Sequence, residues 1–471
     1  MTDEPTAPVS DGIVPTAVPL DLTRPHRIHV VGVGGVGMSA VASVLAGMGQ
    51  RVSGSDLKPS VELERLVSLG VDAQVGHDTR HLDDVDIVTI STAIPANNIE
   101  VVEAERRGIP VLRRADVLAA IAATRSSVAV AGTHGKTTTA SMLALVMVEA
   151  GLRPSFIIGG DINEVGSGAA WGAGEWLVVE ADESDGTFLA LAPQIGVVTS
   201  VEADHLDYYG SLAAMEEAFE RFLARAPTTV VCADDPTAAR LGRARGAVTY
   251  GTSEGADYQM VNLTTARSSS RFTVVQRGVN LGEFRLVVPG LHNARNACGA
   301  LVAGLLVGAS IDAGRRALGR YGGVARRFEF RGERDGITFV DDYAHLPSEV
   351  KAALAAARDG GWDRVIAVFQ PHRYSRTASL WQDFADAFGH ADLLIVTDVY
   401  GAGESPRPGV SGRLVLDAVT AAHPETEGRY LSGHHELVAF LRATLRPGDL
   451  CLTLGAGDLT VLPDELLEDP A

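Results

Sequence analysis

Two glycine-rich turns, each placed between a short apolar run and a helical stretch, constrain the fold more than any other feature of this sequence. The first turn follows IHVV and begins at Gly32, and the second follows SSVAVA and begins at Gly132. Short apolar runs and helical stretches alternate in the same way along most of the chain. This alternation predicts βαβ units, and therefore α/β domains built on parallel sheets.

A chain of 471 residues has room for about three such domains. We expect a disordered tail over residues 1–24 and three α/β domains over residues 25–123, 124–324 and 325–471. The tail is acidic and proline-rich and has no basic segment, so it does not resemble a signal peptide. The Gly- and Arg-rich segment YGGVARRFEF is typical of a hinge before the last domain.

The composition excludes several classes of protein. A formal net charge of −19 argues against a general nucleic-acid binder, which needs a basic face. No apolar run approaches the roughly 20 residues of a membrane helix. The cysteines Cys232, Cys298 and Cys451 form no CxxC pair, so they support neither a disulfide framework nor a zinc site. We therefore expect a cytoplasmic protein that binds anions through helix N-termini, single arginines or a metal ion.

The first glycine turn has the spacing of a dinucleotide-binding motif. Gly32, Gly34 and Gly37 lie between a predicted strand and a helix, and Asp56 ends the next predicted strand. Such glycines allow the backbone to approach a pyrophosphate, which the helix N-terminus then faces. Asp56 would accept a hydrogen bond from a ribose hydroxyl. The motif alone leaves NAD, FAD and nucleotide sugars open as ligands.

The second turn is typical of a phosphate-binding loop. It consists of Gly132, Thr133, His134, Gly135, Lys136, Thr137 and Thr138. Backbone N–H groups and the helix dipole at such a turn bind phosphate oxygens. Lys136, the only lysine between residues 59 and 350, would neutralise the β- and γ-phosphates, and the Thr137 hydroxyl would bind Mg²⁺. The loop departs from the generic pattern because Val130 stands where the first glycine would be.

Acidic residues follow the next two predicted strands. The run EADESD begins at Glu180, and the run EADHLD contains His205. The carboxyl ends of parallel strands meet at the edge of a sheet where ligands bind. Clustered carboxylates repel one another unless a cation or water screens them, and Mg²⁺ with oxygen ligands is the natural partner of ATP phosphates. We interpret His205 as a metal ligand or substrate contact, with a solvated acidic loop as the alternative for the carboxylates.

Further polar clusters adjoin predicted elements in the second half of the chain. HNARNA begins a helix at His292, where side-chain amides would either cap the helix or recognise an adenine edge. Arg327 lies in the hinge, where a guanidinium group can clamp phosphate as domains close. DDYAH ends one strand with Asp342 and His345, and PHRYSR follows another with two guanidinium groups for anions.

In this order, GTHGKTTT, EADESD, ADHLDYYG, HNARNA, RRFEFRG and DDYAHLPSEV resemble the Mur ligases of peptidoglycan synthesis across nearly the whole chain. GVGGVGMSAVA, ADESD and QPHRYSRT point to the branch that adds L-alanine to UDP-N-acetylmuramate. The resemblance implies an ATP-dependent ligase that activates the lactyl carboxylate as an acyl phosphate, with Mg²⁺ as cofactor. It also implies a Rossmann-like domain for the UDP-substrate, a central P-loop-type ATPase domain, and a Rossmann-like C-terminal domain that closes over the amino acid. Monomer and homodimer both stay open.

The same resemblance implies roles for individual residues. Catalysis would depend on Lys136, Glu180, His205, Arg327 and His345, with Thr137, Glu180 and His205 as Mg²⁺ ligands. ATP would bind residues Gly132 to Thr138 together with His292, Asn293, Asn296, Arg327 and Asp342. The UDP-substrate would bind Gly34, Gly35, Gly37, Met38, Ser39, Asp56, Ser91, Thr92, Ala93, Arg373 and Arg376.

Two departures and two alternatives accompany this interpretation. Several Mur ligases carry a carbamylated lysine beyond the DHxD segment, but this chain has no lysine between Lys136 and Lys351. Leu346 replaces the second histidine of the family pattern DDYxHHP, so His345 or a carboxylate would have to deprotonate the amine. One alternative is the Mur ligase that recycles a tripeptide onto the same UDP-sugar. The other is a dinucleotide-dependent oxidoreductase, which would leave Lys136 unused.

Overall fold

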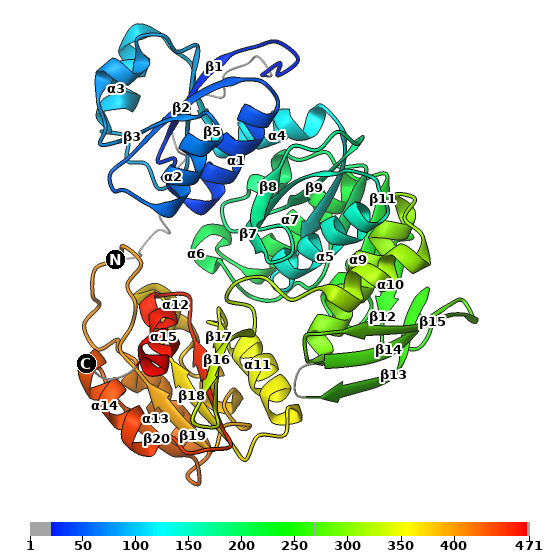
Figure 1. Cartoon of the computed structure of the whole chain (residues 1–471), viewed down its shortest axis with the longest axis vertical. Coiled ribbons are helices and arrows are strands. Elements are labelled where there is room, and N and C mark those ends of the chain that lie inside the picture. Colours follow the sequence, from blue (N-terminus) through cyan, green and yellow to red (C-terminus); the bar gives the residue numbers. More distant parts are fainter. Residues whose placement is uncertain (1–19, 267–268, 469–471) are drawn as a thin grey trace, which may run out of the picture. The chain divides into compact units, whose positions relative to one another are not determined.

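The computed structural model describes residues 20–266 and 269–468, which form two compact units that divide between Thr124 and Arg125 (Figure 1). We call residues up to Thr124 unit 1 and the rest unit 2. Most of the expected tail lies outside the described residues. Leu22, inside the range expected for the tail, is buried, and its carbonyl accepts a hydrogen bond of 3.1 Å from Nε2 of Gln50. The chain is therefore already packed at Leu22.

Unit 1 is a doubly wound α/β domain with one parallel sheet in the order β3-β2-β1-β4-β5. The strands are β1 (Arg27–Val31), β2 (Arg51–Asp56), β3 (Asp72–Val75), β4 (Ile87–Ile90) and β5 (Val111–Arg113). The helices are α1 (Val36–Gly47), α2 (Val61–Ser68), the 3₁₀ helix η1 (Thr79–Leu82), α3 (Ile99–Arg107) and α4 (Arg114–Ala123). The strand order reverses beside β1, which is where such sheets bind nucleotides.

Local sequence signals explain the elements of unit 1. The apolar side chains of β1 and β4 are buried on both faces of the sheet, as expected for parallel strands covered by helices. Asn98 caps the N-terminus of α3 by accepting from the N–H of Glu100, and Gly108 ends this helix in the left-handed conformation. These signals position Glu100 at the first turn of α3, inside the domain.

Unit 2 begins with a ten-stranded sheet in the order β15-β14-β13-β12-β11-β10-β6-β9-β7-β8. The strands are β6 (Ser126–Ala131), β7 (Ser155–Ile162), β8 (Ser167–Ala170), β9 (Trp176–Glu180), β10 (Ile195–Val198), β11 (Thr228–Cys232), β12 (Val248–Gly251), β13 (Tyr258–Ala266), β14 (Ser269–Gln276) and β15 (Val279–Leu286). The helices are α5 (Lys136–Glu149), η2 (Thr187–Ala190), α6 (Leu206–Tyr209), α7 (Leu212–Ala224), α8 (Pro236–Arg243), α9 (Leu291–Leu306) and α10 (Ile311–Arg320). The middle strands are parallel, and β13 to β15 form an antiparallel meander at one end.

The helix after the second glycine turn is the centre of this domain. Every side chain of α5 from Thr137 to Met147 is buried, because the helix packs against the sheet and against α9 and α10. Small residues allow α9 to approach closely, and a Cβ on Gly304 would meet Val146 of α5 at 2.8 Å. A helix that is apolar all round belongs inside a domain rather than on its surface. Its N-terminus is therefore held rigidly beside the sheet.

The C-terminal part of unit 2 is a second α/β domain with the sheet order β16-β17-β21-β18-β19-β20. The strands are β16 (Glu329–Arg334), β17 (Ile337–Asp342), β18 (Arg364–Phe369), β19 (Leu393–Val396), β20 (Glu427–Tyr430) and β21 (Asp449–Leu454). The helices are α11 (Pro347–Asp359), α12 (Tyr374–Leu380), η3 (Asp383–Asp386), α13 (Arg413–Ala422), α14 (His434–Thr444), η4 (Asp458–Val461) and α15 (Leu462–Leu467). All pairs are parallel except β16 with β17, and apolar clusters cover both faces of the sheet. The three α/β domains that we predicted are confirmed.

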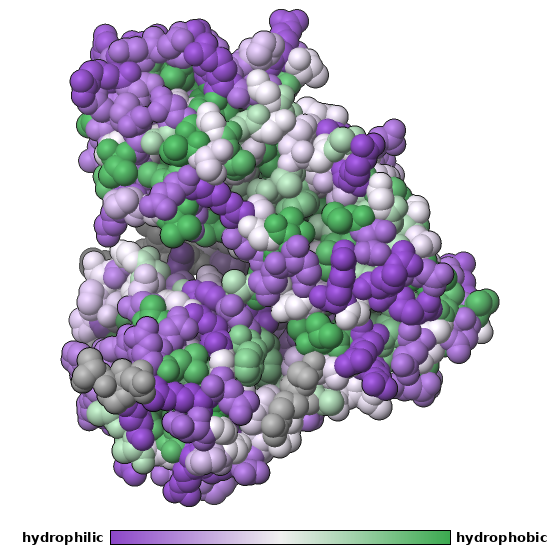
Figure 2. All heavy atoms as spheres, viewed as in Figure 1, coloured by the Kyte–Doolittle hydropathy of each residue, from purple (hydrophilic) through white to green (hydrophobic). Residues whose placement is uncertain are grey.

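The face drawn in Figure 2 is mainly hydrophilic, with apolar residues scattered in small groups. This surface agrees with the high net negative charge of the chain. Among the residues that the structure describes, no helix combines the length and the apolar character needed to cross a bilayer.

Candidate functional site

Three neighbouring strands of the large sheet end at the same level, and their ends carry the predicted site. In β6 and β9, Val130 pairs with Glu180, and in β6 and β10, Ala131 pairs with Val198. The glycine turn after β6, the acids after β9 and the histidine after β10 therefore meet at one edge. This is the carboxyl edge of a parallel sheet, where α/β proteins bind ligands.

Two glycines of the second turn are required by close contacts. Gly132 and Gly135 both have positive φ angles, of 138° and 76°. A Cβ on Gly132 would overlap Oγ1 of Thr199, and one on Gly135 would overlap Oδ1 of Asn296. The N–H of His134 donates to Oγ of Ser200 at 3.0 Å, which ties the turn to the loop after β10. The turn is thus fixed from both sides before any ligand binds.

Lys136 is the first residue of α5, and its ammonium group points back into the turn. Nζ donates to the carbonyl oxygen of Gly132 and to Oε1 of Glu183, each at 2.7 Å. Burial alone would lower the pKa of Lys136, but the Glu183 and Asp182 carboxylates outweigh burial and raise this pKa. Lys136 is therefore a cation at neutral pH, in a position to meet phosphate oxygens.

The side chains around Lys136 fit a divalent cation. Oγ1 of Thr137 donates to Oε1 of Glu180 at 2.8 Å, which places a hydroxyl beside a carboxylate. Oε2 of Glu183 is buried and has no hydrogen-bond partner among the described residues. Nε2 of His205 lies 3.9 Å from Oε1 of Glu183, and burial lowers the pKa of His205, so its imidazole is neutral. Carboxylate, hydroxyl and neutral imidazole are suitable metal ligands, and an orphaned carboxylate oxygen calls for a cation.

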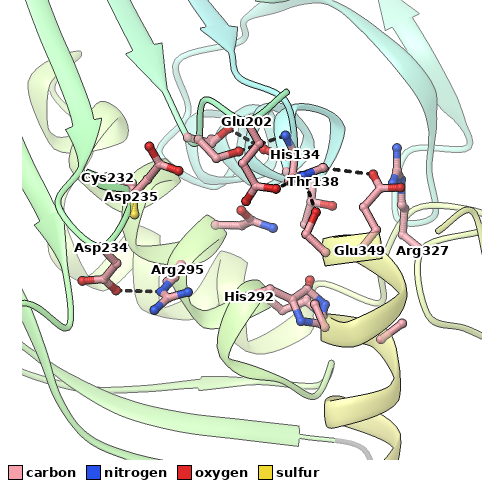
Figure 3. A pocket seen from close by; sticks show the side chains of 18 of the residues that line it. His134, Thr138, Glu202, Cys232, Asp234, Asp235, His292, Arg295, Arg327 and Glu349 are labelled. Atoms are coloured by element: carbon pink, nitrogen blue, oxygen red, sulfur yellow. Dashed lines mark hydrogen bonds and ion pairs between the residues drawn. The ribbon is translucent and has the colours of Figure 1, made fainter. Parts of the chain in front are cut away.

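A cavity of about 340 Å³ adjoins this edge (Figure 3). Its walls come from the second glycine turn, the loops after β10 and β11, the N-terminus of α9, the hinge and α11. The predicted ATP residues that line it are His134, Gly135, Thr138, His292, Asn293, Asn296, Arg327 and Asp342. Gly132, Thr133, Lys136 and Thr137 are not part of its wall, and Lys136 and Thr137 instead contact Glu183 and Glu180. A cavity of this size suits a small-molecule ligand.

The walls of the cavity differ in polarity. Burial, reinforced by Arg295 and Arg327, lowers the pKa of His292 to about 4, so this imidazole is neutral. Nδ2 of Asn293 donates to the carbonyl of Pro289 at 2.7 Å, so this amide is tied to the backbone just before its own helix. Deeper in the cavity lie the buried side chains of Cys232 and Tyr250. A planar, mostly apolar group with a few polar edges fits this part of the cavity.

His134 joins the two domains of unit 2 across the cavity (Figure 3). Its Nδ1 lies 3.2 Å from Oε1 of Glu349 on α11, and its Nε2 lies 3.2 Å from Oε2 of Glu202. Burial opposes a charge on His134, but hydrogen bonds to Glu202 and Glu349 raise its pKa to about 9. Oε2 of Glu349 also accepts from the N–H of His345 at 3.0 Å. One carboxylate therefore connects the second glycine turn to the start of α11.

The hinge presents Arg327 to the cavity and keeps Asp342 in its wall. The guanidinium of Arg327 lies 5.1 Å from the ring centre of Tyr343. The Asp342 carboxylate accepts from the N–H groups of Phe328 and Ala344, each at 2.7 Å. Burial raises the pKa of Asp342 to about 6 even though Arg327 opposes this shift. Asp342 therefore braces the hinge backbone in addition to bordering the cavity.

A second polar cluster lies next to the acids, at the strand ends of the C-terminal domain. The rings of His345 and His372 are 5.6 Å apart, and Nη1 of Arg376 lies 2.9 Å from Nδ1 of His372. Nη2 of Arg376 donates to Oδ1 of Asp204, which precedes His205 in the central domain. Nε of Arg373 is buried without a partner among the described residues. The cluster offers guanidinium groups to an anion on one side and a neutral histidine on the other.

Leu346, which stands where the family pattern has a second histidine, fits the fold of the C-terminal domain. Its side chain is buried in the core of the C-terminal domain, and its N–H donates to Oε2 of Glu349 at 3.2 Å. His345 precedes it, with Nδ1 3.0 Å from the carbonyl of Tyr343. Burial lowers the pKa of His345, so this imidazole is neutral at pH 7.

Unit 1 has a pocket of about 290 Å³ at the end of β1. The predicted residues that line it are Gly35, Gly37, Met38, Asp56, Ser91 and Ala93. Gly34, Ser39 and Thr92 lie outside its wall. Gly34 nevertheless contacts a residue of the wall, since the N–H of Gly34 donates to Oδ2 of Asp56 at 2.9 Å. Asp56 thus holds the glycine turn with one oxygen, a role that we did not predict.

Several residues of these sites were missing from the sequence prediction. In unit 2 they include Glu202 and Glu349, and in unit 1 they are His77 and Arg114, which line the pocket. A signal for Glu349 was available, because an acid two residues after a helix-starting proline occupies the first turn of the helix. The contact between Glu349 and His134 joins segments that are far apart in sequence, and no local sequence pattern predicts this contact.

Family models match almost the entire described chain. A model for the Mur ligase family, catalytic domain, matches residues 27–126, a Mur ligase middle domain matches residues 130–304, and a Mur ligase glutamate ligase domain matches residues 326–457.

Individual proteins agree with these models. The UDP-N-acetylmuramate–L-alanine ligase of Pelotomaculum thermopropionicum is 45% identical and covers 95% of this chain and 98% of its own. The ligase of the same name from Solidesulfovibrio magneticus is 47% identical over 94% of this chain and 98% of its own. The crystal structure of UDP-N-acetylmuramate-alanine ligase from Thermotoga maritima superposes with a TM-score of 0.79 at 29% identity, covering 94% of this chain and 98% of that one.

Proposed function

This chain belongs to the Mur ligase family, and we propose that it joins L-alanine to the lactyl carboxylate of UDP-N-acetylmuramate in peptidoglycan precursor synthesis. The reaction converts ATP to ADP and phosphate. The observation that carries the proposal is similarity over nearly the full length to ligases named for this reaction, together with a phosphate-binding turn whose lysine meets a buried acid cluster. We place the reaction in the cytoplasm, where ATP is supplied.

The first step that we propose makes the carboxylate reactive. A carboxylate does not react with an amine at neutral pH, because oxide is a very poor leaving group. A lactyl carboxylate oxygen attacks the γ-phosphorus of ATP, the bond to the β,γ-bridging oxygen breaks, and ADP leaves. Lys136 and the N–H groups of the turn stabilise the charge on the transferred phosphoryl group.

We propose Thr137, Glu180 and His205 as the residues that hold Mg²⁺, with Glu183 close to them. A bound Mg²⁺ would neutralise phosphate charge and so reduce the repulsion between two anionic reactants. Lys136 lies among these acids, and burial raises the pKa of Glu183 to about 7 even though Lys136 opposes this shift. The adenine ring would lie in the cavity beside His292, Asn293 and Asn296.

In the second step, the amine of L-alanine attacks the acyl carbon and phosphate leaves. The amine must first lose a proton, and we propose His345 as the acceptor because burial keeps it neutral and its Nδ1 is held by the carbonyl of Tyr343. Arg373 and Arg376 would bind the amino acid or muramyl carboxylate. In unit 1, Asp56, Ser91 and Arg114 would bind the UDP portion.

The decisive experiment offers the full chain UDP-N-acetylmuramate and MgATP with L-alanine, glycine, L-serine or the tripeptide L-Ala-γ-D-Glu-meso-diaminopimelate, and identifies products by mass. Formation of UDP-N-acetylmuramoyl-L-alanine as the main product supports the proposal. Preference for the tripeptide would assign the chain to the recycling branch. Reduction or oxidation of NAD with no amide formed would instead support an oxidoreductase.

A further inference from the structure

Unit 1 contains a buried carboxylate surrounded by three imidazoles, of which only that of His77 also lines the pocket proposed for the UDP portion. Glu100, at the first turn of α3, is fully buried. His29 lies in β1, His77 precedes η1, and His81 belongs to η1. Histidines from β1 and from the segment around η1 thus converge on one carboxylate, although a single ion pair would suffice to neutralise it.

The carboxylate of Glu100 is densely contacted. Oε2 accepts from the hydroxyl of Ser55 at 2.5 Å and lies 3.0 Å from Nδ1 of His77. Oε1 lies 2.7 Å from Nδ1 of His81 and accepts from the N–H of Asp78 at 3.1 Å. Both oxygens of this buried carboxylate are therefore contacted by groups of β2 and of residues 77–81.

His29 is the feature that sets this cluster apart. Its side chain is only 1% exposed, and its Nε2 has no hydrogen-bond partner among residues 20–266 and 269–468. That nitrogen lies 3.5 Å from Oε1 of Glu100. The other ring nitrogen, Nδ1, is 2.9 Å from Oγ of Ser53, which fixes the orientation of the ring. In the tautomer that donates to Ser53, the lone pair of Nε2 faces the carboxylate, an arrangement that a cation between them would stabilise.

We propose that His29, His81 and Glu100 form a binding site for a transition-metal ion of the zinc class. One ligand atom from each residue can be chosen so that all three lie within 4.8 Å of one another. In a tetrahedral zinc site with bonds of about 2.0 Å, neighbouring ligand atoms are about 3.3 Å apart. The separations of 3.5 and 2.7 Å from Glu100 to the two histidines bracket that value.

The chemistry of the donors favours zinc over magnesium. Two imidazoles and one carboxylate, with the fourth position left to water, are a ligand set that zinc uses, whereas Mg²⁺ prefers oxygen ligands. The contact between His29 and Ser53 supplies the outer hydrogen bond that commonly orients a metal-bound histidine. The side chain of His81 is 23% exposed, which gives an ion a route to the site.

The test measures metal uptake by the full chain after removal of metals with a chelator. The protein is dialysed against Zn²⁺ or Co²⁺ in a large excess of Mg²⁺, which occupies the oxygen-rich cluster of unit 2, and bound metal is counted by elemental analysis. We expect the wild type to bind one more equivalent of Zn²⁺ than His81→Gln. The Co²⁺ form should show the strong visible absorption of four-coordinate cobalt, and His81→Gln should lose it. The variant His435→Gln, which removes an exposed histidine of unit 2, should bind as much metal as the wild type.

Two results would overturn the proposal. Equal uptake by the wild type and His81→Gln would assign any bound zinc to another part of the chain. Absence of uptake by the wild type would mean that protons alone balance the charge of Glu100. His29→Gln is a second variant that should also bind one equivalent of Zn²⁺ less than the wild type. If His29→Gln fails to fold, the His81→Gln variant, at a partly exposed position, still decides the question.

Discussion

The two glycine turns have similar sequences and the same position between strand and helix, yet their surroundings differ. In unit 1, Gly35 precedes a helix that begins with Val36, and the backbone of Gly35 is extended. In unit 2, Gly135 precedes a helix that begins with Lys136, and the backbone of Gly135 is left-handed. Both turns present a helix N-terminus, which suits an anion.

What differs is the set of charges next to each turn. Asp56 accepts from the first turn, and Arg114 and His77 line the pocket beside it. The second turn has a partly buried lysine among carboxylates and a charged His134 that reaches another domain. The comparison teaches that a shared backbone motif provides anion binding, whereas the added charges decide whether the anion is only held or also reacts. Four substitutions test this distinction, from the largest expected effect to the smallest.

Lys136→Ala should abolish most of the reaction while leaving unit 1 unaffected. We expect the rate of amide formation to fall by about 10³-fold, because the variant loses the cation that meets the transferred phosphoryl group. The affinity for UDP-N-acetylmuramate, measured by calorimetry, should stay within about twofold. Lys351→Ala, which removes an exposed lysine of α11, is the matched control and should keep its rate. A Lys136→Ala protein with the wild-type rate would show that the two turns do not differ as we describe.

Glu180→Gln should reduce the rate by about 10²-fold at fixed Mg²⁺ and raise the Mg²⁺ concentration needed for half-maximal activity. The amide keeps an oxygen next to Thr137 but removes a negative charge from the proposed metal site. Glu175→Gln, at an exposed position before the same strand, should change neither quantity. An unchanged Mg²⁺ dependence in Glu180→Gln would remove this carboxylate from the metal site.

Arg114→Ala should affect binding rather than reaction. We expect KM for UDP-N-acetylmuramate to rise by about tenfold, since one charge-assisted hydrogen bond to phosphate contributes roughly 1.5–3 kcal/mol. The value of kcat and KM for ATP should change little. The neighbour Arg113, which is exposed, provides the control Arg113→Ala. A loss of kcat with no change in KM would place Arg114 in the reacting site instead.

His134→Gln should change how stability depends on pH, with an effect of about 1–3 kcal/mol. The pKa of His134 is raised to about 9 in the folded protein, above the ordinary histidine value near 6.5. Its stabilising contribution is therefore complete below about pH 6.5 and is lost as the pH rises through about 9. Thermal unfolding of the nucleotide-free protein between pH 6 and 10 should show this decline in the wild type and in His435→Gln, but not in His134→Gln. If the stability of all three proteins changed with pH in the same way, a charged His134 between Glu202 and Glu349 would be contradicted.

Much of the fold followed from local patterns, and part of the site did not. The strand, glycine turn and helix around Gly132 were predictable because apolar runs, glycine and Lys136 are adjacent in sequence. Which acid faces Lys136 was not predictable, because Glu180 ends the strand while Glu183 turns inward in the following loop and becomes fully buried. The contact of His134 with Glu349 depends on two domains packing together, and no local pattern encodes that packing.

Cys232 gives the cavity that we propose for the nucleotide an unusual chemical property. Burial raises the pKa of this thiol to about 11, so at pH 7 about one molecule in ten thousand carries the reactive thiolate. Electrophilic adenine analogues directed at this cavity should therefore leave the sulfur unmodified, and peroxide should oxidise it slowly. A covalent inhibitor of this chain would need a different anchor, although a sulfur atom stands in the wall of its binding site.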